Sequence, residues 1–198
     1  LVNGTVVDVT WREPVRYFVS ERNDNDVSAV ELREALARAA ATWTAVETAQ
    51  VHFEFQGMTS AIPGVVGGRS TIGFVDRPDL DQVLGATSFM IDTTNGAILE
   101  ADIFFNSRFA WSVAAGGASG RVDLEWVGLH ELGDLLGVSH SAVGDTDQAT
   151  PARGSQLFAS TSGEVASNPA ASRSGRATAA RAAAIVCAMY PRLTSTVS

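Results

Sequence analysis

The segment HELGDLLGVSHS, residues 130–141, constrains the fold more than any other part of the chain. At about 100° per residue, His130 and Asp134 lie about 40° apart on one face of a helix. The opposite side carries three leucines, Leu129, Leu132 and Leu136. The segment therefore predicts a helix with one apolar face against a core. Gly137 suits a left-handed residue that ends this helix and lets the chain turn back.

The polar side chains of this segment have the spacing of a metal site. His130 and Asp134 would be two ligands one turn apart, and the turn at Gly137 could carry His140 back as a third. Three protein ligands and a water form the open arrangement of a catalytic zinc. Glu131 stands beside them, where it could take a proton from that water. A bare His-Glu-x-x-Asp would favour a solvated polar face, but the added Gly-x-x-His favours the metal site.

Two helices and several strands can be placed around the motif. Ser28 and Glu31 have capping-box spacing and predict the start of the first helix. Its apolar face would consist of Leu32, Leu36, Ala39, Trp43 and Val46. Asp123 can cap the helix that carries the motif. Apolar runs predict strands at 14–20, 51–55, 70–76, 83–92 and 98–107.

The turn chemistry and the strand alternation refine this outline. The pair Asn95-Gly96 predicts a hairpin between the last two strands, because both residues tolerate positive φ. In VHFEF the buried face would be Val51, Phe53 and Phe55, so His52 is predicted to face solvent and not to bind a metal. The order of elements predicts an α+β fold, a twisted mixed sheet of four to five strands packed on two long helices.

The residues after about 146 differ in composition from the rest. Ala, Ser, Arg, Gly and Thr dominate, and periodic apolar residues are few. We expect residues 1–146 to form the folded domain and 147–198 to be a low-complexity tail, a long loop that adds little to the fold. The run AARAAAIVCAMYP near its end could add a short apolar helix or turn.

Bulk properties exclude several classes of function. The net charge of -8 argues against binding to nucleic acid, which needs clustered Lys and Arg. No apolar run approaches the length of a membrane span. The first residues, LVNGTVVDVTWREP, lack the features of a signal peptide, so they do not indicate a compartment. With one cysteine, Cys187, and three histidines, the chain has no intrachain disulfide and no second His-rich metal site.

The motif resembles the matrixin branch of the metzincin zinc endopeptidases, whose pattern is His-Glu-x-x-His-x-x-Gly-x-x-His. The stretches WREPVRYFVS, ATWTAVETAQVHFEF, VLGATSFMID, ILEADIFFNSRFAWSV and RVDLEWVGLHELG also resemble bacterial matrixin-like catalytic domains, so the likeness covers about residues 5–145. It implies a zincin-like domain that cleaves internal bonds of extended peptides.

The resemblance assigns roles to individual residues. His130, Asp134 and His140 match the zinc ligands, and Glu131 matches the general base. An edge strand beside the cleft would hold the substrate by β-addition through Leu84, Gly85, Ala86 and Thr87. The run AMYP, with Met189, resembles the methionine turn below the zinc, which would place that turn near 187–191. The resemblance also implies a monomer that lies outside the cell or in the cell envelope.

Three features depart from the matrixin pattern. Asp134 replaces the second histidine, the structural zinc of animal matrixins has no ligands here, and the biased tail separates AMYP from the motif. A carboxylate can bind zinc, but the Asp side chain is shorter than imidazole and anionic. We therefore expect weaker zinc binding and slower hydrolysis. The alternative is a pseudoenzyme that keeps the cleft and binds peptides or proteins without cleaving them.

Calcium is left open as a second ion. Four acidic residues fall in predicted loops or at their borders, Asp76, Asp79, Asp81 and Asp92. Solvated surface acids are the favoured interpretation, because acidic loop residues are usually just hydrated.

Overall fold

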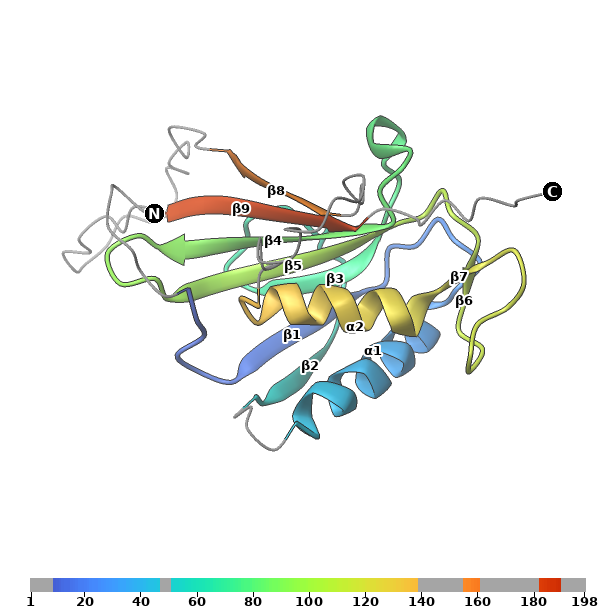
Figure 1. Cartoon of the computed structure of the whole chain (residues 1–198), viewed down its shortest axis with the longest axis horizontal. Helices are drawn as coiled ribbons and strands as arrows, with labels where there is room; N and C mark the ends of the chain where they lie inside the picture. Colours follow the sequence, from blue (N-terminus) through green and yellow to red (C-terminus); the bar gives the residue numbers. More distant parts are fainter. Residues whose placement is uncertain (1–8, 47–50, 139–154, 161–181, 190–198) are drawn as a thin grey trace, which may run out of the picture.

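A mixed β-sheet with both helices on one face forms the framework of the domain (Figure 1). The computed structural model describes residues 9–46, 51–138, 155–160 and 182–189. The sheet order is β2-β1-β3-β5-β4-β9-β8. Its strands are β1 (Val15–Ser20), β2 (Phe53–Thr59), β3 (Ser70–Val75), β4 (Gly85–Asp92), β5 (Ile98–Asn106), β8 (Ser155–Ser160) and β9 (Ala182–Met189).

The first five strands confirm the predicted α+β fold. Strands β2, β1, β3 and β5 run parallel, and β4 is antiparallel to β5. The helices are α1 (Ala29–Thr44) and α2 (Leu124–Leu135), with a short 3-10 turn, η1 (Pro78–Leu80). A small second sheet pairs β6 (Trp111–Ser112) with β7 (Val122–Asp123). Within the described ranges, no helix has the length and apolar character needed to cross a membrane.

Helix α1 follows the sequence prediction at its start and departs from it at its end. Ser28 and Glu31 form the predicted capping box. Leu32, Leu36 and Ala39 are each 1% exposed, as the helical spacing predicts. Val46 is 42% exposed, because the helix ends at Thr44 and residue 46 no longer follows its periodicity.

Helix α1 packs closely against α2 where the Trp43 ring lies over Gly133. The Trp43 indole Nε1 donates to the carbonyl of Leu129 at 2.7 Å. A Cβ at Gly133 would lie 2.6 Å from Cζ2 of Trp43, so only glycine lets the two helices approach this closely. On α2, Leu132 is buried in the core and Leu129 and Leu136 pack against it, as predicted.

The β4–β5 hairpin brings the sheet under α2. Gly96 has φ 76°, and its N–H donates to the carbonyl of Asp92 at 2.7 Å, which confirms the predicted turn. Residues of β5 alternate between the two faces of the sheet. Ala101, Ile103 and Phe105 lie in the core on the helix side, each 0% exposed.

Two regions differ from the sequence prediction. Phe55 was expected on a buried face but is 39% exposed, because it packs at the surface against the Tyr17 ring and under the Arg33 guanidinium. In the tail, residues 155–160 and 182–189 are strands, not a loop with a short helix or turn. The backbone of β4 offers β9 a full ladder, a partner that local composition does not reveal.

Candidate metal site

Helix α2 carries the three polar side chains of the motif. The N-cap Asp123 accepts from the N–H groups of Glu125 and Trp126, at 3.0 and 3.2 Å. The helix ends at Leu135, and Gly137 then adopts φ 86°, as predicted. A Cβ at Gly137 would lie 2.7 Å from the carbonyl oxygen of Val9, so the close approach of the chain also requires glycine.

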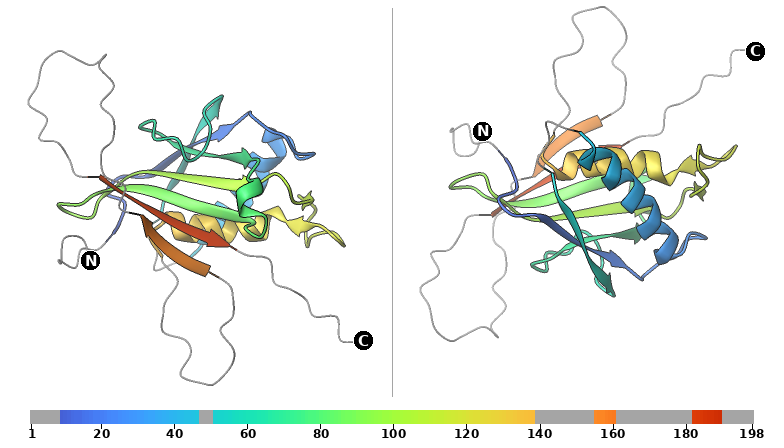
Figure 2. Two further views of the ribbon diagram at one scale, coloured as in Figure 1. Left: turned by 90° about the horizontal axis from the view of Figure 1, so that it is seen from above. Right: turned by 90° about the horizontal axis from the view of Figure 1, so that it is seen from below.

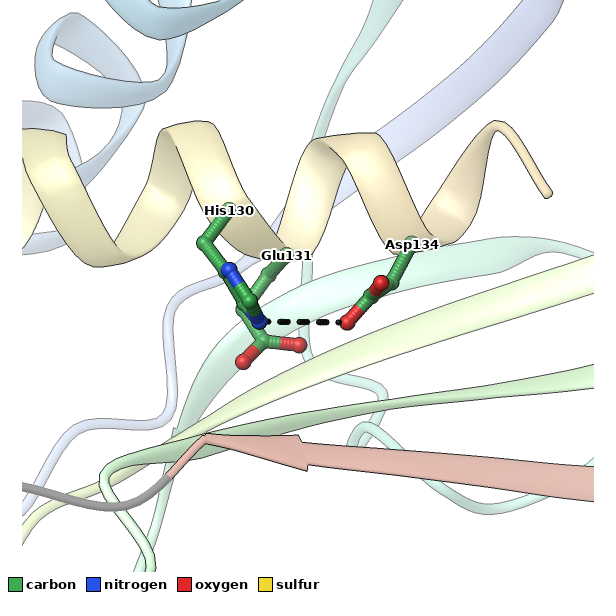
Figure 3. Close-up of side chains that lie close together, drawn as sticks. All are labelled: His130, Glu131 and Asp134. Atoms are coloured by element: carbon green, nitrogen blue, oxygen red, sulfur yellow. Dashed lines mark ion pairs between the residues drawn. The ribbon is translucent and has the colours of Figure 1, made fainter. Parts of the chain in front are cut away.

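His130, Glu131 and Asp134 converge below α2 (Figure 3). One possible ligand atom from each lies within 4.8 Å of the others, and among the described residues this is the only such group of three. The Nε2 of His130 is 3.4 Å from Oδ2 of Asp134. Glu131 is 0% and Asp134 4% exposed. The two carboxylates are therefore not part of a solvated polar face.

The spacing of His130 and Asp134 fits a zinc ion. Bonds of about 2.0–2.2 Å in a tetrahedron place two ligand atoms about 3.3–3.6 Å apart. The 3.4 Å between Nε2 and Oδ2 lies in this range. The expectation that the short Asp side chain falls short of the metal stays a prediction, because the distance joins the two side chains and not a side chain and an ion. The donor set, one imidazole nitrogen and one carboxylate oxygen, is also one that zinc accepts.

Glu131 lies in a closed niche between α2 and β4. The hydroxyl Oγ1 of Thr87 donates to Oε2 of Glu131 at 2.7 Å. A Cβ at Gly85 would lie 3.3 Å from Oε1, so the missing side chain leaves room for the carboxylate. Oε1 has no hydrogen-bond partner among the described residues. Burial raises the pKa of Glu131 well above its ordinary value, against the lowering effect of Thr87, and the charge of Asp134 raises it further.

Strand β4, the predicted substrate strand, is not a free edge in this structure. It pairs with β5 on one side and antiparallel with β9 on the other, from Gly85↔Met189 to Asp92↔Ala182. Figures 1 and 2 show β9 beside β4 along its length. Of the predicted substrate-binding residues, Leu84 precedes β4, Gly85, Ala86 and Thr87 begin it, and all four are buried. No signal in the sequence indicated that Thr87 would contact Glu131.

The third predicted ligand and part of the predicted methionine turn lie outside the described residues. His140 falls outside the described residues. Met189 is the last residue of β9, so residues 187–189 are strand where a turn was expected, and residues 190 and 191 are not described. His52 is exposed, as predicted.

Three of the four acidic residues considered for calcium are engaged in other contacts. Asp79 pairs with Arg77 at 2.7 Å and Asp76 with Arg108 at 3.4 Å. Asp92 accepts from the hydroxyl of Thr94 at 2.6 Å. These contacts resemble ordinary surface acids and turn caps.

One buried acidic pair escaped the sequence analysis, Glu100 and Asp102 of β5. Asp102 accepts backbone N–H groups from Thr71 and Gly64, both at 2.7 Å. Glu100 accepts from Gly67 and Gly68. Because N–H donors occupy these oxygens, the pair anchors the loop before β3. Burial raises the pKa of Asp102 to about 6, although both backbone hydrogen bonds lower it.

Comparison with models of protein families gives a match that covers most of the chain. The model of the matrixin peptidase family matches residues 10–147, which include His130, Glu131, Asp134 and His140. A search of curated proteins found no match.

Proposed function

The chain belongs to the matrixin family of metallopeptidases, and from this membership we propose that it is a zinc-dependent endopeptidase domain acting on extended peptides. One observation carries the proposal. His130 Nε2 and Asp134 Oδ2 are 3.4 Å apart, a spacing that suits zinc, and the buried carboxylate of Glu131 lies beside them.

The proposed zinc ligands are His130, Asp134 and His140. His140 is included because of its spacing from the motif and because the chain turns at Gly137. When bound, zinc polarises the scissile carbonyl and makes a water molecule more acidic. The anionic Asp134 reduces this effect relative to a third imidazole, so we propose a slower enzyme than one with three histidines.

Glu131 is the proposed general base. Its Oε1 accepts a proton from the attacking water and returns it to the nitrogen of the leaving amine. The raised pKa of Glu131, caused first by burial, favours a carboxyl that can hold this proton between the two steps. Oε2 is held by Thr87 throughout, so Oε1 is the oxygen left for proton transfer.

The proposed substrate is a peptide in extended conformation that pairs with β4. On the side away from β5, β4 pairs with the eight residues of β9, so this side fits an antiparallel strand of that length. A substrate strand would have to displace β9 or bind where β9 moves away.

We propose that the domain acts outside the cell or in the cell envelope.

A peptide-binding pseudoenzyme is the second candidate, and the substitution at position 134 favours it. The Nε2 of His130 and the Oδ2 of Asp134 are 3.4 Å apart, so the two side chains could pair with each other without a metal. Such a protein would keep the strand-binding side of β4 and bind peptides without hydrolysis.

Peptide cleavage by matched variants tests the proposal. The full chain, loaded with zinc, is incubated with a mixed peptide pool, and new N-termini are identified by mass spectrometry. Glu131→Gln keeps the shape of the side chain and should lower turnover by about 100-fold or more while zinc stays bound. Glu125→Gln is the control, a half-exposed glutamate of the same helix that pairs with Arg38. Peptide binding without cleavage in the wild type would favour the pseudoenzyme.

A further inference from the structure

Thr87 is the residue through which the sheet contacts the carboxylate of Glu131. It is 0% exposed, and its Oγ1 lies 2.7 Å from Oε2 and 3.1 Å from the backbone oxygen of Glu131. A hydroxyl has one proton to donate, and the carboxylate is the nearer acceptor.

The hydroxyl of Thr87 has little freedom to move. Threonine is branched at Cβ, which restricts its rotation about χ1. Its backbone is held in the ladder on both sides, opposite Ile103 of β5 and Cys187 of β9. The sheet therefore fixes the donor, and the donor fixes the position of one oxygen of Glu131.

The two carboxylate oxygens of Glu131 have different surroundings. Gly85, two residues earlier on the same face of β4, leaves open the space beside Oε1, where a Cβ would lie 3.3 Å away. The carboxylate is thus held at Oε2, while the buried Oε1 has no hydrogen-bond partner among the described residues. Figure 3 shows it on the same side of α2 as the ends of His130 and Asp134.

We propose that Thr87 is a positioning residue for the general base. Its hydroxyl holds Oε2 of Glu131 so that Oε1 meets the attacking water beside His130 and Asp134. The inference rests on the proposed function, because it assigns Thr87 a part in the same reaction. It replaces the expected role of Thr87 as a contact to the substrate.

Two substitutions separate positioning from simple packing. Thr87→Val keeps the branched shape and removes the donor, and Thr87→Ser keeps the donor. We expect kcat of Thr87→Val to fall about 10- to 100-fold, since small misplacements of a reacting group cost about this much. KM and zinc affinity should stay within about 2-fold. Thr87→Ser should recover kcat to within about 3-fold of the wild type.

A spectroscopic readout follows the contact without turnover. In metal-free protein with 13C-labelled glutamate, the Glu131 carboxyl resonance is identified by its loss in Glu131→Gln. It should move in Thr87→Val and stay near its wild-type position in Thr87→Ser. In the Glu131→Gln background, Thr87→Val should cause no further loss of residual turnover.

The outcomes distinguish the two proposals. A wild-type chain that binds zinc but cleaves no peptide overturns both the proposed function and the role of Thr87 in it. An active wild type with an equally active Thr87→Val overturns the role of Thr87 alone. Equal losses in Thr87→Val and Thr87→Ser, or a matching rise in KM, would also overturn it, because the hydroxyl would then not be the feature that matters.

Discussion

Two buried carboxylates lie on opposite faces of the sheet, and they are satisfied in different ways. Asp102 lies on the face away from the helices and accepts a backbone N–H at each oxygen. Glu131 lies on the helix side. Its Oε2 accepts a hydrogen bond from the Thr87 hydroxyl, while its Oε1 has no hydrogen-bond partner among the described residues. Burial raises the pKa of both.

The difference separates a structural acid from a reactive one. Backbone N–H groups donate to both oxygens of Asp102, so this carboxylate serves to hold the loop that contains Gly64. An incompletely satisfied buried polar atom is costly, and natural proteins keep few of them. The half-satisfied carboxylate of Glu131 is thus better explained by chemistry than by stability.

The largest effect predicted from this comparison concerns Asp102 and pH. Between its ordinary pKa of 3.8 and its folded pKa of about 6, the native state keeps a proton that the unfolded chain has released. The free energy of unfolding should therefore fall as pH rises through this window, by up to about 3 kcal/mol at about 1.4 kcal/mol per unit. Urea unfolding of metal-free protein at several pH values measures this slope.

Asp102→Asn should remove this contribution, so its curve should be flatter than that of the wild type between pH 4 and 6. Asp26→Asn is the control, because the Asp26 side chain is 88% exposed and contributes no comparable burial. Parallel curves of unfolding free energy against pH for Asp102→Asn and the wild type would show that Asp102 titrates near its ordinary pKa. Asp102 would then not share the raised pKa of Glu131.

A smaller effect is expected at the other carboxylate site, where Asp134→His replaces an anionic ligand beside Glu131. Imidazole nitrogen suits zinc better than carboxylate oxygen. We expect zinc to bind about 10-fold more tightly, equal to about 1.4 kcal/mol, and peptides to be cleaved faster. Competition with a chromogenic chelator measures the affinity.

Asp26→His controls for the metal affinity of any added surface histidine. Circular dichroism checks that the larger side chain is accepted at position 134, which is 4% exposed. Unchanged affinity and cleavage in a folded Asp134→His would show that position 134 does not face the metal.

The sequence predicted those elements whose signals are local. The capping box at Ser28, the turn at Gly96 and the helix end at Gly137 each depend on a few adjacent residues, and all three are confirmed. The pairing of β9 with β4 depends on residues about 90 to 104 positions apart and on a backbone ladder that composition does not report. For this reason residues 182–189 were expected as a short helix or turn.

The site was predictable to the same extent. Helical spacing brought His130, Glu131 and Asp134 together correctly, because all three lie on one helix. The contact of Thr87 with Glu131 joins two elements 44 residues apart, and a threonine in a strand carries no signal of such a partner.

Zinc content of the purified chain, measured by mass spectrometry after dialysis against a weak chelator, decides whether this helix holds a metal. We expect about one zinc per chain in the wild type and in Glu131→Gln, and almost none in His130→Ala. Zinc that is absent from the wild type, or that His130→Ala retains in full, would contradict a metal site built on His130 and Asp134.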